Sequence, residues 1–235
     1  MLAPLASFSQ EDTDQTTEND TLSYQQKYGL RVGTDISKLV RSFIDDEYSG
    51  FELNADYRLS HNLYLAGEIG NEEKTTINDY LTTTAKGSYF KGGVDFNMYH
   101  NWLDMQNMIY FGFRLGASTF SQNLDSYTVY NSNPYWENPI TATNTSESKG
   151  LTAIWGEIMI GIKTEVLNNL YMGLNVQLKG LVNQTEPGAF ENLYIPGFGR
   201  TYDSGRFGMG FGYNISYSIP IYKKSKKTVS EETEE

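Results

Sequence analysis

The chain has 235 residues, of which 39% are hydrophobic and 20% are charged, so it can bury the core of one domain or of two small ones. Its 29 acidic and 18 basic residues give a net charge of -11, which argues against a nucleic-acid partner, because phosphate would be repelled. The absence of cysteine excludes disulfides, thiolate metal ligands and thiol nucleophiles. No run of about 18 apolar residues occurs, so no membrane-spanning helix is expected, although short alternating strands can also cross a membrane.

The chain begins with two segments that differ in composition from the rest. Residues 1–9 are small and apolar and are typical of the remnant of a secretory signal peptide, although an ordinary N-terminus is an alternative. Residues 10–26 are acidic and poor in apolar side chains, which predicts a disordered segment. The folded part is therefore expected at 27–224.

Within that part, apolar and polar residues alternate with a period of two. Seven segments with this pattern occur at residues 28–37, 51–59, 63–70, 89–98, 109–116, 154–166 and 170–179. In the eighth segment, 207–221, every odd position is apolar, whereas the even positions hold small or polar residues and Pro220. A helix would scatter both sets around its axis, so eight amphipathic strands are expected, with no helical period between them. Residues 225–235 then predict a charged periplasmic tail.

Two architectures accept such strands. A soluble sandwich or lipocalin-like barrel turns its apolar face inward, whereas an outer-membrane barrel turns that face outward to lipid. The connections are mostly short on one side, at 60–62, 99–107 and 168–169, and mostly long on the other, at 42–47, 71–84, 121–150 and 183–204. This asymmetry favours an all-β fold: an eight-stranded antiparallel up-and-down transmembrane β-barrel in the outer membrane of a Gram-negative cell.

The polar face of the strands carries six basic and seven acidic residues. They are Arg31, Arg58, Lys91, Arg114, Lys163 and Lys179, and Asp35, Glu52, Asp56, Glu68, Asp95, Glu157 and Glu165. This balance predicts charge pairs that fill a narrow lumen, so no conducting pore is expected; on a soluble sandwich the same charges would face water. Aromatic residues near strand ends predict interfacial girdles: Tyr48, Tyr57, Trp102, Tyr110, Tyr171, Tyr213, Tyr217 and Tyr222.

Several strings also carry a family resemblance across residues 27–224. They are KYGLRVGTDISK, NLYLAGEIGNEEKTT, NWLDM, EVLNNLYMGLNVQLK and NLYIPGFGR. On these strings the chain resembles an uncharacterised family of small outer-membrane β-barrel proteins of Bacteroidota, a domain of unknown function. The resemblance implies an outer-membrane location, no known activity, and an association with large outer-membrane complexes such as the barrel-assembly machinery.

No catalytic or metal-binding constellation is found. Both histidines, His61 and His100, fall in predicted periplasmic turns, so a Ser-His pair is not expected. Carboxylates four residues apart on a strand lie about 13 Å apart, too far for a glycosidase pair. The acidic cluster at 45–47 is more simply a solvated turn than a cation site, and the glycines at 208–212 lack a nucleotide-binding spacing. We therefore predict no catalytic residue, cofactor or metal.

Two function classes remain open. In the first, the protein is a non-enzymatic structural or accessory subunit of a multiprotein outer-membrane complex that serves outer-membrane protein assembly, and it binds other outer-membrane proteins or lipoproteins and outer-membrane lipid. In the second, it is a lipid-modifying enzyme or a narrow solute channel. The candidate partner contacts are Trp102, Leu103, Tyr135, Trp136, Tyr194 and Phe198. The residues of the long loops could equally cap the barrel.

Overall fold

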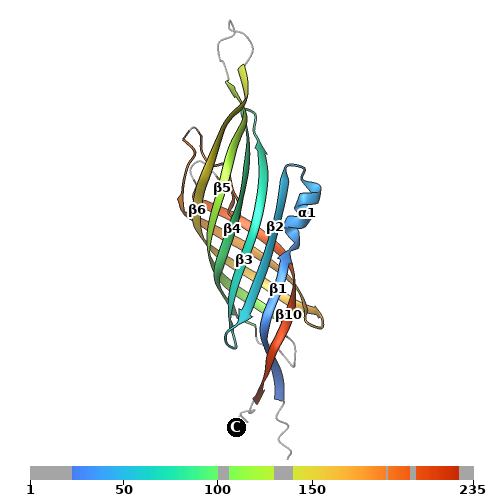
Figure 1. The fold of residues 1–235 in the computed structure, drawn as a ribbon. Helices are drawn as coiled ribbons and strands as arrows, with labels where there is room; N and C mark the ends of the chain where they lie inside the picture. Colours follow the sequence, from blue (N-terminus) through green and yellow to red (C-terminus); the bar gives the residue numbers. More distant parts are fainter. Residues whose placement is uncertain (1–22, 100–105, 130–139, 189, 202–204, 228–235) are drawn as a thin grey trace, which may run out of the picture.

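The computed structural model describes residues 23–99, 106–129, 140–188, 190–201 and 205–227. Its long strands are β1 (Ser23–Asp35), β2 (Tyr48–Arg58), β3 (Leu63–Ile77), β4 (Leu81–Asn97), β5 (Met108–Val129), β6 (Ile140–Leu167), β7 (Leu170–Gln184) and β10 (Phe207–Lys227). All pairings are antiparallel, and the order β1-β10-β7-β6-β5-β4-β3-β2 closes the sheet into a barrel (Figure 1). The prediction of an all-β sheet of eight strands is confirmed.

The two faces of the sheet differ as the alternation predicts. Along β5, Tyr110 and Arg114 are buried inside the ring, whereas Phe111 and Phe113 between them are exposed on the outside. Polar side chains thus line the lumen and apolar side chains cover the outer wall. The girdle prediction is wrong for Tyr48, Tyr110 and Tyr171, which are buried because they share the inward face of their strands with the charged residues.

At one end of the ring, four strands continue past the others. We call this part, residues 75–77, 81–84, 122–129 and 140–148, the four-strand extension. The predicted long loops at 71–84 and 121–150 are corrected in part, because β3, β4, β5 and β6 occupy much of them. These stretches lack apolar alternation, but threonine favours strands, and Thr75 and Thr84 are hydrogen-bonded across the sheet at 2.9 Å.

At the opposite end, which we call the terminal end, β1 and β10 form a two-stranded ribbon (Figure 1). β1 begins at Ser23 and β10 ends at Lys227, opposite each other. The folded part therefore extends beyond the predicted range 27–224 at both ends. Residues 23–26, predicted to be disordered, belong to β1, and residues 225–227, predicted to be a tail, belong to β10. Residues 1–22 and 228–235 lie outside the described residues.

A helix that the sequence pattern did not predict follows β1. α1 (Ile36–Ile44) is capped by Asp35, whose carboxylate accepts a hydrogen bond from the backbone N–H of Ser37 at 2.8 Å. We call the end of the ring that holds α1 the helix end (Figure 1). No helix among the described residues is long and apolar enough to cross a bilayer.

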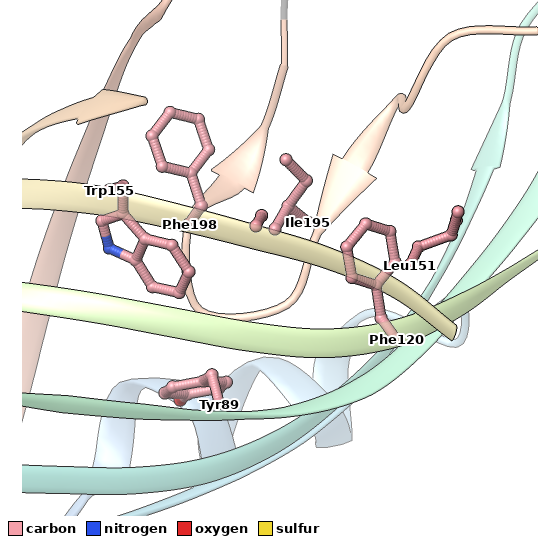
Figure 2. Close-up of a cluster of buried hydrophobic side chains, with 7 residues drawn as sticks. Tyr89, Phe120, Leu151, Trp155, Ile195 and Phe198 are labelled. Carbon is pink, nitrogen blue, oxygen red and sulfur yellow. The ribbon is translucent and has the colours of Figure 1, made fainter. Parts of the chain in front are cut away.

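A hairpin folds back into the lumen at the helix end. Its strands are β8 (Tyr194–Ile195) and β9 (Gly199–Arg200), and we call residues 192–201 the plug hairpin. Ile195 and Phe198 pack against buried side chains of β4, β5 and β6, including Tyr89 and Trp155 (Figure 2). The aromatic rings of Trp155 and Phe198 meet edge to face, with 6.0 Å between their centroids. The hairpin thus closes this end of the lumen with an apolar cluster.

Candidate functional site

Buried ion pairs join the charged side chains of the lumen into one chain of alternating sign. Near the terminal end, Asp56 accepts hydrogen bonds from Arg31 Nε at 2.6 Å and from Lys163 Nζ at 2.8 Å. Asp95 lies 3.7 Å from Lys163 Nζ and 2.8 Å from Arg114 Nη1. Because these five side chains are all buried, each charge depends on its neighbours in place of water.

The chain of ion pairs continues toward the helix end. Glu68 lies 3.3 Å from Arg114 Nε and accepts a hydrogen bond from Lys91 Nζ at 2.9 Å. Lys91 Nζ also lies 3.4 Å from Glu52, which in turn lies 3.5 Å from Lys38 Nζ of α1. For these groups the structure confirms the predicted pairing of lumen charges.

A side branch runs through Glu157 on β6. One of its oxygens accepts a hydrogen bond from Trp155 Nε1 at 2.7 Å and lies 3.8 Å from Lys91 Nζ and 3.6 Å from Lys179 Nζ. Lys179 Nζ also donates to the carbonyl oxygen of Gly197 at 2.7 Å. Lys179 is thus held mainly by a backbone carbonyl, and its only ion pair among the described residues is a long one.

Glu72 joins three separate parts of the molecule at the helix end. Its carboxylate accepts hydrogen bonds from Lys38 of α1, from Tyr48 Oη at 3.1 Å, and from Tyr194 Oη at 2.8 Å. The backbone N–H of Gly197 in the plug hairpin adds a fourth bond at 2.9 Å. Gly197 has a φ of 83°, and a Cβ there would lie 2.5 Å from the ring of Tyr89, so this position requires glycine.

α1 occupies a gap in the wall of the ring. β1 pairs with β2 only as far as Thr34 and with β10 only as far as Asp35, so residues 48–52 of β2 and 207–213 of β10 have no strand partner on that side. α1 contacts both strands. Ser42 Oγ accepts from the N–H of Gly50 at 2.8 Å, and Asp35 Oδ1 accepts from the N–H of Tyr213 at 3.3 Å. Side chains in and next to the helix therefore accept hydrogen bonds from some of the backbone N–H groups that the two strand edges leave unpaired.

A cavity of about 570 Å³ lies beneath α1, between the helix, the plug hairpin and β10. A second cavity, of about 20 Å³, lies deeper in the lumen near Asp56 and Arg114 and has room for about one water molecule. The open space of the lumen is thus concentrated at the helix end.

Two ionisable groups in and next to α1 have shifted pKa values. Burial opposes the charge of Lys38, but the carboxylates of Glu72 and Glu52 outweigh burial and raise its pKa above the usual value. The hydrogen bond from Lys74 Nζ lowers the pKa of Asp45, just after α1. Both shifts favour the charged forms, so the contacts of α1 are ionic at neutral pH.

The chemistry available to these groups is limited by their pairing. The carboxylates of Asp56, Glu52 and Glu72 each face at least two positive or hydrogen-donating groups, so they are engaged in structural contacts and are poorly placed to act as general bases. Among the residues that the structure describes, no three side chains of types that ligate metals gather into a site. The arrangement is suited to holding a shape and binding a ligand.

The structure places the candidate partner contacts in two groups. Tyr194 and Phe198 are buried in the plug hairpin, so their interpretation as exposed contacts is corrected in favour of the capping alternative. Trp102, Leu103, Tyr135 and Trp136 lie outside the described residues.

Two central residues, Lys38 and Glu72, were not predicted. Glu72 continues the inward face of Glu68 and Gly70, and reading the alternation past residue 70 would have found it. Lys38 could have been predicted as a lumen residue only if α1 had been predicted first.

Comparison with known proteins gives one match. The family model "Domain of unknown function (DUF6048)" matches residues 1–224. No curated protein and no solved structure matches the chain.

Proposed function

The chain belongs to the family described as Domain of unknown function (DUF6048), and we propose that it is a transmembrane β-barrel of the outer membrane. In this proposal it acts without catalysis, as an accessory subunit of a multiprotein complex that serves outer-membrane protein assembly. The observation that carries the proposal is the inverted distribution of side chains, with ion pairs inside and an apolar wall outside.

The outer wall supports the membrane location. Every strand of the ring turns at least one large apolar side chain outward: Val32, Leu53, Ile69, Phe90, Phe113, Ile160, Val176 and Ile219 are examples from the eight strands. In water this belt would exceed the few hundred Å² of contiguous apolar surface that soluble monomers expose. Lipid would cover it, and the closed ring would satisfy the backbone groups that face the hydrocarbon.

The lumen supports a binding role over transport or chemistry. Its charges are paired along the length of the ring, and the inner cavity has room for about one water molecule. We therefore expect no stable conductance when the protein is placed in planar bilayers. Open channels of reproducible size would contradict this part of the proposal.

The four-strand extension supports contacts with other proteins. It projects past the ring (Figure 1), and it carries exposed apolar side chains beyond the belt, including Ile77, Tyr127 and Val129. Exposed apolar residues outside the lipid belt are typical of protein interaction surfaces. Partner proteins or lipoproteins would dock here and at the periplasmic link 99–107.

Site-specific crosslinking in living cells tests the subunit role. Photoreactive side chains replace Tyr127 and Val129 in the extension, and Trp102 and Tyr135 in the loops that the sequence predicts. Phe90, on the lipid-facing wall, is the control position. We expect a discrete adduct with the same outer-membrane protein from at least two of the four positions, and none from Phe90. If all four positions behave like Phe90, the subunit role is overturned.

A further inference from the structure

The cavity beneath α1 opens toward the outer wall of the barrel. Its entrance is lined by Val40 and Ile44 of α1 and by Met209 and Phe211 of β10. Met209 is 80% exposed and Phe211 is 77% exposed, compared with 42% for Phe111 on the same belt. The wall is therefore least covered by its own neighbours where the cavity meets the lipid-facing surface.

The inner end of the cavity is polar, and the carboxylates of Glu72 and Glu52 there are already occupied by protein donors. Glu72 accepts four hydrogen bonds from protein groups. Glu52 accepts from Tyr89 Oη at 2.6 Å and is flanked by Lys38 and Lys91. Glu72 and Glu52 thus leave little room for a cationic ligand, and Asp35, which also lines the cavity, uses Oδ1 to cap α1 and to accept from the N–H of Tyr213.

Hydrogen-bond donors, in contrast, remain available in the cavity wall. The ammonium of Lys179 has three N–H groups; one donates to Gly197, and Glu157 is too distant, at 3.6 Å, for a good second bond. The amide of Gln177 donates one of its two N–H groups, to Asn175 at 2.7 Å. The unused N–H groups at the inner end therefore favour a ligand that accepts hydrogen bonds and carries negative charge.

Glycine makes room for such a ligand. Gly210 lines the cavity from β10, and a Cβ at this position would lie 3.0 Å from Gln177 Oε1 and 3.1 Å from Lys179 Cε. The bare backbone thus passes directly beside the two available donors. A side chain here would take up the space that a ligand needs to reach them.

We propose that this cavity binds the anionic head group of a single-chain amphiphile, with a carboxylate or phosphate against Lys179 and Gln177. The acyl chain leaves between α1 and β10 and lies against the apolar entrance. The volume of about 570 Å³ is within the range of small-molecule sites and is sufficient for a head group and part of a chain. The inference rests on the membrane location proposed above, since the ligand enters from the bilayer.

Photolabelling of the purified protein in phosphatidylcholine vesicles tests the inference. The probe is a 16-carbon fatty acid with a diazirine in mid-chain, and the adducts are mapped by mass spectrometry. We expect adducts at Val40, Ile44, Met209 and Phe211 to exceed those at Phe111 by about tenfold, because a charged hydrogen bond is worth at least that factor in binding. The methyl ester of the same probe, which lacks the charge, should lose this enrichment.

Two variants locate the head group. Lys179→Met removes the ammonium, and Gly210→Val fills the inner end of the cavity, so each should lower the enrichment to the level of the methyl ester. Gly212→Val is the matched control, because it adds the same side chain to the next lumen-facing position of β10, outside the cavity lining. Gel mobility without boiling checks that each variant is folded. The methyl ester arm needs no variant and decides the question if a variant does not fold.

The outcomes separate this inference from the membrane proposal. Adducts spread evenly over Met209, Phe211 and Phe111, or an enrichment that the methyl ester retains, would overturn the head-group site and leave the membrane location intact. If no belt residue is labelled, the membrane location is overturned and the amphiphile site with it.

Discussion

The two ends of the lumen are closed in different ways. At the terminal end β1 is hydrogen-bonded to both β2 and β10, and the charges around Asp56 fill the interior. At the helix end α1 takes the place of the strand, and a cavity of about 570 Å³ remains. A strand can form backbone hydrogen bonds with both neighbouring strands along its whole length. A helix can bind the backbone groups of those strands only through side chains such as Ser42. Helix closure therefore leaves the open space that strand closure removes.

This difference assigns separate roles to the two ends. The terminal end fixes the shape of the barrel, because its ion pairs are short and buried. The helix end combines an apolar entrance with hydrogen-bond donors that have capacity left, and it is suited to a ligand. Substitutions at each end test this assignment.

Removing a charge at the terminal end should have the largest effect. Among the described residues, Asp56→Asn leaves Arg31 with no carboxylate partner and Lys163 with only a long contact to Asp95, at 3.7 Å. Uncompensated buried charge costs about 3–5 kcal/mol, so we expect the free energy of unfolding in detergent to fall by about that amount. Urea titration followed by tryptophan fluorescence measures it.

The matched control for Asp56→Asn is Glu73→Gln. Glu73 pairs with Lys86 at 2.7 Å, but both side chains are exposed on the outside. Exposed pairs contribute about 1 kcal/mol or less. Equal small losses in the two variants would mean that water, and not ion pairing, stabilises the lumen charges.

Glu72→Gln should have the next largest effect and should act at the helix end. The variant weakens the carboxylate's bonds to Lys38, Tyr194 and Gly197 together. We expect a loss of about 2–3 kcal/mol, because Lys38 keeps only Glu52 as its partner. Hydrogen exchange should speed up in α1 and in the plug hairpin, while the amides around Asp56 stay protected. Uniform loss of protection would contradict the separation of the two ends.

The contrast between the ends also explains what the sequence could predict. Strand alternation is regular around Arg31, Asp56 and Lys163, so their inward positions could be predicted from parity alone. At the helix end the apolar residues Ile36, Val40 and Ile44 recur every four positions, but over nine residues this period is too short to stand out beside a strand.

The cavity could not be predicted from the sequence, because it depends on register. It exists where β1 leaves the ring before β2 and β10 do, and this is set by the pairing of Thr34 with Leu53 and of Asp35 with Asn214. The burial of Phe198 likewise follows from the path of the plug hairpin, which local composition does not determine.

A smaller effect is expected where α1 meets the edge of β2. Ser42→Ala removes the oxygen that accepts from the N–H of Gly50, which leaves that N–H without its side-chain partner. We expect a loss of about 1 kcal/mol, seen as roughly fivefold faster exchange of the Gly50 amide. Ser49→Ala is the control, because Ser49 is exposed beside it on β2. Equal exchange rates in the two variants would show that Ser42 does not protect this edge.

The smallest effect concerns the pH dependence of the segment after α1. The hydrogen bond from Lys74 lowers the pKa of Asp45 in the folded state, so the stabilisation is complete above the unfolded pKa of about 3.9 and is lost as the pH falls through the folded value. Hydrogen exchange around residues 45–48 should therefore show increasingly frequent local opening as the pH is lowered below about 4, after correction for intrinsic rates. The effect is small because Asp45 is partly exposed. In Lys74→Met this dependence should shrink, since the ion pair that lowers the pKa is absent. An unchanged pH profile in Lys74→Met would mean that Lys74 does not anchor the end of α1 to the ring.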